Sequence, residues 1–238
     1  MNDQPALRSL RPVGGAARCA VAALVLAGAA WAAVALCQLR LALSGMPASG
    51  LPDQGGGRHR TLTSLENAFH VVSALASATT VLCAFTFLAW LWRVRDNARV
   101  LFGQPPRYAG PWVYAGWIVP VANLWVPRGI IVDIHRASAP GQRLPGAVNW
   151  WWGLWLAGML SGTSLMYTGS ADDVIAHAYQ DVRPLLAADA AVIGAAVSGI
   201  FVVRALTAAQ RQRTGSGPRF ETGGTAAGWA TRHPELRG

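Results

Sequence analysis

The sequence predicts an all-α, polytopic integral membrane helix bundle with four spanning helices and one Pro-broken re-entrant or kinked segment. Of the 238 residues, 53% are hydrophobic and only 13% are charged, whereas soluble domains average about 25% charged residues. The chain also contains apolar stretches of about 20 residues, the length that crosses a bilayer as a helix. Every basic residue is arginine, and the arginines flank these stretches. That placement indicates membrane orientation and predicts no nucleic-acid partner, despite a pI near 10.9.

The first apolar run follows an arginine-containing N-terminal arm, residues 1–18, that we expect to be cytoplasmic. The run is too long for the core of a typical signal peptide, so it predicts a retained signal-anchor helix. The spans are expected at about residues 19–43, 68–92, 148–168 and 186–206, which together delimit a membrane domain of residues 19–206.

Local signals support the later elements. Thr63 or Ser64 can cap the second helix, with Glu66 in its first turn. In the last helix, Gly194 and Gly199 suit close helix packing. The region 207–238 is rich in Gly, Thr and Arg, and it predicts a disordered cytoplasmic tail.

The segment 110–132 is apolar but is interrupted by Pro120, Asn123 and Pro127. Proline breaks a helix, and the freed backbone groups must be satisfied by protein or water if the break lies in a membrane. The segment is therefore predicted either to enter and return on one side or to cross as a kinked helix. Asn123 is expected either to cap the break or to line a small cavity.

A short amphipathic helix is predicted over residues 128–138. Its apolar stripe would comprise Ile130, Ile131 and Ile134, and Asp133 could pair locally with Arg136. This pattern is typical of an anchor on the inner leaflet.

The distribution of arginine favours the re-entrant alternative. If segment 110–132 returns to its own side, both termini and the arginine-rich loops 93–109 and 128–147 are cytoplasmic. The outside then keeps only Arg58, Arg60 and Arg183. The alternative is that segment 110–132 spans and another segment, most readily the last, does not cross.

Tryptophan is concentrated in the second half of the membrane domain. The main interpretation is an interfacial aromatic belt, and the alternative is a stacking wall for a flat or lipid-like ligand. The residues are Trp112, Trp117, Trp125, Trp150, Trp151, Trp152 and Trp155.

No catalytic, metal or cofactor site is predicted. The cysteines Cys19, Cys37 and Cys83 form no metal-ligand pattern, and common nucleophile and phosphate-loop motifs are absent. Acid–base chemistry by Asp133 and His135 would lack an evident nucleophile or metal partner.

Two stretches of the chain resemble a family of bacterial, mostly actinobacterial, membrane proteins, domain of unknown function 4328. The first stretch, FLAWLWRVRDNA, fits the pattern W-x-x-R-x-x-x-N-A, and the second contains P-x-x-N-L-W-x-P and ends in R-A-S. Arg128 and His135 depart from the usual pattern. The resemblance implies a multi-span membrane protein and no reaction. The matching residues are Trp90, Arg93, Asn97, Ala98, Pro120, Asn123, Leu124, Trp125, Pro127, Arg136, Ala137 and Ser138.

The resulting hypothesis is a non-enzymatic protein of the bacterial plasma membrane. Its arginine-rich cytoplasmic face would contact membrane lipids, a protein partner or a second copy of the chain. One alternative is a small transporter or channel-like subunit with a polar path near Asn123. A second alternative is a membrane enzyme that uses Asp133 and His135 on a lipid at the inner interface.

Overall fold

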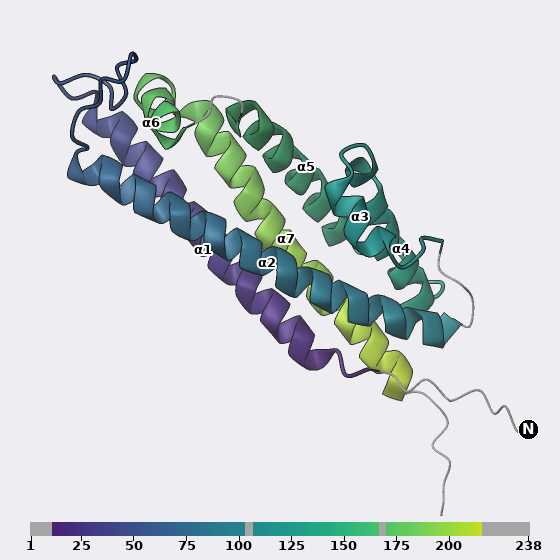
Figure 1. Ribbon diagram of the computed structural model, residues 1–238. Helices are drawn as coiled ribbons and strands as arrows, with labels where there is room; N and C mark the ends of the chain where they lie inside the picture. Colours follow the sequence, from purple (N-terminus) through teal and green to yellow (C-terminus); the bar gives the residue numbers. More distant parts are fainter. Residues whose placement is uncertain (1–10, 103–106, 167–169, 216–238) are drawn as a thin grey trace, which may run out of the picture.

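The described residues of the protein form helices joined by loops, and they contain no strand apart from one isolated bridge between Asp53 and His59. The computed structural model describes residues 11–102, 107–166 and 170–215. The helices lie side by side in an elongated bundle (Figure 1). The predicted all-α class is therefore confirmed.

Three helices in the described part of the chain are long and apolar enough to cross a membrane. They are α1 (Gly14–Ser44), α2 (Ser64–Phe102) and α7 (Arg183–Gly215). α1 packs against both of the others (Figure 1). Large apolar side chains on their outer faces, such as Phe85 and Phe201, are more than half exposed. Such surfaces suit contact with lipid, and these helices support a membrane-embedded protein.

α5 (Gly146–Met166) lies along α7 and approaches it closely through glycine. A Cβ added at Gly158 would lie 2.8 Å from Val192 Cγ2, and one added at Gly194 would lie 2.9 Å from Leu154 Cδ1. The expectation of close packing at Gly194 is confirmed. α5 corresponds to the expected span 148–168, but it is not among the three candidate spans found in the described residues.

At one end of the bundle, residues 45–63 meet α6 (Ala171–Gln180), and we call this the loop end (Figure 1). α6 begins with a capping box between Ser170 and Asp173. The sequence analysis placed no helix between the expected spans 148–168 and 186–206, a stretch that contains Asp172, Asp173 and Asp181. Of these, Asp172 and Asp173 lie in the first turn of α6, where the backbone N–H groups favour negative charge.

A buried carboxylate ties the loop end together. Arg60 donates to both carboxylate oxygens of Glu66, at 2.8 and 2.6 Å, and the Tyr179 hydroxyl donates to Oε1 at 2.9 Å. Thr63 and Glu66 also form a capping box at the start of α2, which confirms the predicted cap. Burial, followed by the bond to Glu66, raises the pKa of Tyr179 to about 12, so the phenol remains a neutral donor.

The broken segment forms a helical hairpin of α3 (Trp112–Ile118), the short 3-10 turn η1 (Ala122–Leu124) and α4 (Val126–Ser138). The two helices of the hairpin touch where α3 carries a glycine. A Cβ added at Gly116 would lie 2.7 Å from Val126 Cγ1.

Both ends of this hairpin lie at the same end of the bundle. The Tyr108 carbonyl, before α3, accepts a hydrogen bond from Arg95 at 2.6 Å. After the turn, Gln210 of α7 donates to the Val94 carbonyl at 2.7 Å and to Ser138 Oγ at 3.4 Å. Arg95 and Val94 are neighbours on α2, so the chain enters and leaves at one level. We call this end the hairpin end (Figure 1).

α4 is amphipathic as predicted, but its apolar stripe does not face a membrane surface. Ile130, Ile131 and Ile134 are buried in the core formed with α2 and α7. The expectation of an interfacial anchor is therefore wrong. Burial against neighbouring helices removes more apolar surface from contact with polar surroundings than a half-immersed position would.

α7 extends further than the sequence predicted. Disorder was expected from Thr207, yet the helix continues to Gly215. Thr207 and Gln210 are buried, and both bond to α2. These tertiary bonds, and the good helix formers Ala, Gln and Arg in this stretch, explain the extension. The remaining parts of the predicted arm and tail, residues 1–10 and 216–238, lie outside the described residues.

Replacing Glu66 with glutamine should destabilise the protein, because the Arg60 guanidinium would lose its buried carboxylate partner. Breaking such a pair costs roughly 3–5 kcal/mol. We expect the free energy of unfolding, measured by denaturant titration of the protein in detergent, to fall by about 3 kcal/mol. Asp53→Asn is the control, since the Asp53–His59 contact is exposed. Equal losses in the two variants would contradict a buried ion pair at Glu66.

Two glycines of the same helix provide a test of the α5–α7 contact. Gly158→Leu should lower the unfolding midpoint, because its side chain would overlap Val192. Overpacking of this kind costs about 1–3 kcal/mol. Gly153→Leu should leave the midpoint unchanged or raised, because nothing lies within 4 Å of its added Cβ. The packing described here would be wrong if Gly153→Leu were the more harmful substitution.

Candidate functional site

The motif W-x-x-R-x-x-x-N-A lies on α2, and two of its residues bind the backbone at the start of α1. Asn97 is buried, and its side-chain amide accepts from the Arg11 N–H and donates to the Arg11 carbonyl, both at 2.9 Å. Arg93 is exposed and reaches the Pro12 carbonyl at 3.5 Å. These two motif residues therefore fix where the chain enters the bundle.

The motif also reaches the last helix. Trp90 is fully buried, and its indole N–H donates to Thr207 Oγ1 at 3.2 Å. The end of α4 is held in the same way, since Ser138 is buried beside Gln210 and Arg213 donates to the Ala137 carbonyl. The structure therefore places Trp90 and Ser138 in the joint between α2, α4 and α7.

The prolines of the second motif bracket the turn of the hairpin. Pro120 is exposed at the turn, and Pro127 occupies the second position of α4, where a missing N–H is tolerated. Asn123 is buried, and its amide nitrogen contacts Met159 Sδ at 3.3 Å, while its Oδ1 has no hydrogen-bond partner. The N-cap of α4 is Trp125, with no side-chain capping bond. The expected capping role of Asn123 is therefore wrong.

Several backbone N–H groups around the break donate to carbonyl groups three or four residues away. Val119 N–H donates to the Ala115 carbonyl at 2.9 Å, and Asn123 N–H donates to the Val119 carbonyl at 2.8 Å. Trp125 N–H donates to the Ala122 carbonyl at 3.2 Å. A break built in this way can be placed in an apolar environment at low cost, because these donors do not need water.

The turn of the hairpin presents an apolar surface. Ile118 is 79% exposed and Val121 is 63% exposed. Leu124 and Trp125 continue this surface and are also exposed. A contiguous exposed apolar patch of this kind marks contact with lipid or another apolar partner.

Tryptophans join the hairpin to α2 and α5. Trp117 packs against Phe87 and Trp151, and Trp152 stacks on Trp155 with ring centroids 5.4 Å apart. Since Trp151 and Trp152 are buried, the belt interpretation is wrong for these two residues. They are core residues, because their large apolar rings fill the space between three helices.

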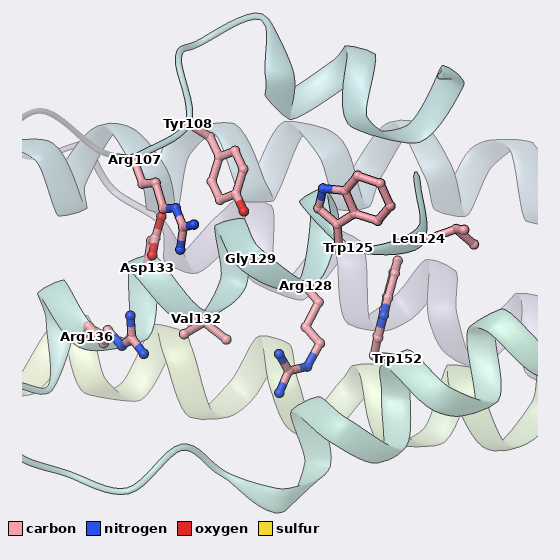
Figure 2. Close-up of a pocket in the computed structure, with 10 residues that line it drawn as sticks. All are labelled: Arg107, Tyr108, Leu124, Trp125, Arg128, Gly129, Val132, Asp133, Arg136 and Trp152. Carbon is pink, nitrogen blue, oxygen red and sulfur yellow. The ribbon is translucent and has the colours of Figure 1, made fainter. Parts of the chain in front are cut away.

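A half-open pocket of about 380 Å³ lies along α4 at the hairpin end (Figure 2). α4 supplies half of its lining, and the segment before α3, the turn before α4 and the side of α5 supply the rest. The lining residues are Arg107, Tyr108, Leu124, Trp125, Arg128, Gly129, Val132, Asp133, Arg136 and Trp152. The structure thus brings together four residues singled out from the sequence, namely Leu124, Trp125, Asp133 and Arg136.

One wall of the pocket depends on a glycine. The Tyr108 ring lies against α4 at Gly129, where an added Cβ would come within 2.5 Å of the phenol oxygen. Figure 2 shows the ring above this position. Any larger residue at 129 would push Tyr108 away and change the shape of the pocket.

The pocket carries three guanidinium groups and one carboxylate. Arg128 donates to Asn149 Oδ1 at 2.8 and 3.3 Å. Asp133 makes no ion pair within the described residues, so the expected local pair with Arg136 is wrong, and its Oδ2 is buried without a partner. Burial raises the pKa of Asp133, while Arg107 and Arg136 act in the opposite direction. The net charge of the lining is positive, and it can attract an anion.

His135 does not join this group. It is buried on the core side of α4, outside the pocket lining, and burial lowers its pKa. Asp133 and His135 therefore do not face one pocket. Among the described residues, no cluster of three His, Cys, Asp or Glu side chains could hold a metal ion.

Sequence reasoning missed Arg107, Tyr108 and Trp152 as members of this pocket. Arg107 was considered only as a loop charge, and Trp152 only as part of the aromatic run. The i, i+4 spacing of Arg128, Val132 and Arg136 places them on one helix face, and this was a readable signal. No sequence signal, however, shows that a loop and another helix flank that face.

Comparison with known sequences gives one finding. A profile of the family described as "Domain of unknown function (DUF4328)" matches residues 58–208. No curated protein and no solved structure matches the chain. The matched range includes Asn97 and the whole hairpin, but not Arg11, to which Asn97 bonds.

Asn97→Ala should loosen the start of α1, because both bonds to the Arg11 backbone would be lost. Arg11 is exposed, so water can replace the lost partner, and each lost hydrogen bond costs about 0.5–1.5 kcal/mol. We expect faster amide hydrogen exchange at Arg11, Val13 and Gly14 and a lower unfolding midpoint. Asp96→Asn is a matched control, since it weakens only the 3.6 Å ion pair with Arg11. The clamp described here would be refuted if Asp96→Asn accelerated exchange as much as Asn97→Ala.

Proposed function

Because the chain belongs to the DUF4328 family, whose description assigns no activity, we propose a function from the geometry. The protein is a non-enzymatic integral membrane protein that presents an arginine-rich face to anionic lipid at the cytoplasmic side of the plasma membrane. A protein partner or a second copy of the chain is the alternative occupant of this face. The observation that carries the proposal is the separation of charge between the two ends of the bundle.

Arginine gathers at the hairpin end. The start of α1 and the end of α7 also lie there (Figure 1). The positive-inside rule assigns an end of this composition to the cytoplasm. The loop end carries Arg40, Arg58, Arg60 and Arg183, and Arg60 is neutralised by Glu66. The arginines on the side of the hairpin end are Arg11, Arg18, Arg93, Arg95, Arg99, Arg107, Arg128, Arg136, Arg143, Arg204, Arg211 and Arg213.

The hairpin fits a re-entrant segment. Its exposed apolar turn would lie inside the bilayer, while Arg107 and Arg136 near its base would lie at the headgroups. The 13 residues of α4 rise about 20 Å at 1.5 Å per residue, which is less than the roughly 30 Å of hydrocarbon in a bilayer. The segment is therefore long enough to enter the membrane and too short to cross it.

α5 is assigned as a fourth span alongside the three candidate spans. Its 21 residues extend about 31 Å, which matches the hydrocarbon thickness. Four spans return the chain to its starting side, so both termini are cytoplasmic. A kinked span at residues 110–132 would instead require the two ends of the hairpin to lie at opposite ends of the bundle.

The two other candidate functions receive less support. A transport path near Asn123 would need that residue in a polar cavity, but Asn123 is buried against Met159 and does not line the pocket. A lipid enzyme using Asp133 and His135 would need both in one pocket, and only Asp133 lies there. Contact with anionic lipid requires neither a polar cavity at Asn123 nor a pocket shared by Asp133 and His135.

Cysteine accessibility tests the topology. Single cysteines are placed at Gly57, Ala109, Val121 and Gly141 in a background where the native cysteines are replaced with alanine. In intact cells, an impermeant thiol reagent should label only Gly57→Cys, and after lysis it should also label Ala109→Cys and Gly141→Cys. Val121→Cys, at the apolar turn, should resist labelling throughout. Labelling of Gly141→Cys but not Ala109→Cys in intact cells would overturn the re-entrant hairpin.

A further inference from the structure

The pocket along α4 has the charge of an anion-binding site. Three arginines and one aspartate line it, and the structure gives Arg107 and Arg136 no carboxylate partner within ion-pair distance among the described residues. Guanidinium groups bind phosphate oxygens through planar, paired N–H donors. Arg128 and Arg136 are eight residues apart on one helix face, about 12 Å along its axis. Arg136 therefore lies with Arg107 near the base of the hairpin, whereas Arg128 lies nearer the turn and donates to Asn149.

The apolar end of the pocket indicates that the anion is carried by a lipid. Leu124 and Trp125 line the pocket and also belong to the exposed apolar turn of the hairpin. Trp152 forms the facing wall (Figure 2). A free phosphate would leave these side chains unused. An acyl chain would continue from the pocket along the turn without leaving an apolar surface.

Asp133 adds a requirement for a hydrogen-bond donor. Its Oδ2 is buried and has no partner in the protein. A buried carboxylate oxygen is costly to leave unpaired, and because Asp133 lines the pocket, a small rotation of its side chain would let a ligand hydroxyl or ammonium group satisfy this oxygen. Because the lining as a whole is positive, an anionic headgroup that carries hydroxyl groups fits better than a zwitterionic one.

We propose that this pocket binds the headgroup of an anionic phosphodiester lipid that carries hydroxyl groups. Arg107 and Arg136 contact the phosphate, Asp133 accepts from a headgroup hydroxyl, and Trp125 and Leu124 contact the start of the acyl chains. This inference rests on the proposed function, because it requires the hairpin end to lie at a membrane surface. The proposed function requires only an arginine-rich face at the hairpin end. The inference adds one defined binding site within that face and a preferred headgroup for it.

The test measures lipid binding to the full chain, purified in detergent and freed of co-purified lipid. Phosphatidylglycerol is titrated, and bound lipid is counted by native mass spectrometry. We expect one tightly bound phosphatidylglycerol per chain, and binding of phosphatidylcholine weaker by at least about tenfold, the ratio that one charge-assisted hydrogen bond supplies.

Matched double variants separate the pocket from the general charge of the face. Arg107→Gln/Arg136→Gln should weaken the first phosphatidylglycerol by about tenfold or more. Arg99→Gln/Arg143→Gln removes the same charge from exposed positions outside the pocket, and it should change binding by less than about twofold, as rim charges do. Equal losses in the two double variants would overturn the pocket and leave the charged face as proposed. Equal binding of phosphatidylcholine and phosphatidylglycerol by the unmodified protein would instead overturn the proposed function itself.

A conservative variant keeps the test decisive if the glutamine variant does not fold. Arg107→Lys/Arg136→Lys retains the charge but not the paired planar donors. It should fold, as judged by circular dichroism, and should lose part of the affinity for phosphatidylglycerol. Unchanged affinity in this variant would refute recognition by the guanidinium groups.

Two further arms identify the headgroup. Asp133→Asn should reduce the preference for phosphatidylglycerol over phosphatidylmethanol, an anionic phosphodiester without a headgroup hydroxyl, and an unchanged preference would refute the role of Asp133. Inorganic phosphate and glycerol phosphate at millimolar concentration should not displace the lipid. Displacement with the same dependence on Arg107 and Arg136 would show that the pocket takes a soluble phosphate, and the lipid assignment would fail.

Discussion

The packing of α4 against α2 and α7 is the contact on which the rest of the hairpin end depends. Ile130, Ile131 and Ile134 bury the apolar face of α4 in this contact. Its base is held by Ser138 through Gln210 of α7. Once α4 is fixed in this way, its other face must point outward. That face, with two arginines and an aspartate, then becomes one side of a pocket.

The break in the chain is what allows α4 to pack there. A continuous helix from residue 110 to residue 138 would carry the second half away from the level of Arg95. The turn at Pro120 reverses the chain instead, and the close approach at Gly116 lets α3 and α4 lie together. The backbone bonds around the turn need no water, so an apolar environment is compatible with the reversal. The residues of the family motif therefore form the hairpin and attach it to α2 and α7.

The two ends of the bundle use charge differently. At the loop end, Glu66 is buried and bonded to Arg60 and Tyr179, so its charge holds α2, the loop and α6 together. At the hairpin end, Arg107 and Arg136 face an open pocket beside a carboxylate oxygen without a partner. Compensated charge inside a structure stabilises it or fixes its geometry, while uncompensated charge at an opening attracts a ligand. This contrast, rather than any sequence motif, distinguishes the residues that hold the fold together from those that we propose to bind lipid.

Sequence by itself determined the helical class, the apolar segments, the break at Pro120 and Pro127 and the amphipathic pattern of α4, because these depend on local composition and periodicity. It also singled out Asn123, Asp133 and Arg136. Only the tertiary structure decided that the apolar stripe of α4 faces the core, that Asn97 clamps Arg11, and that α7 continues past Thr207. Each of these results depends on a contact between residues far apart in the chain. The pocket is of the same kind, since its walls come from α4, α5 and the segment before α3, and no local pattern shows which distant segments will meet.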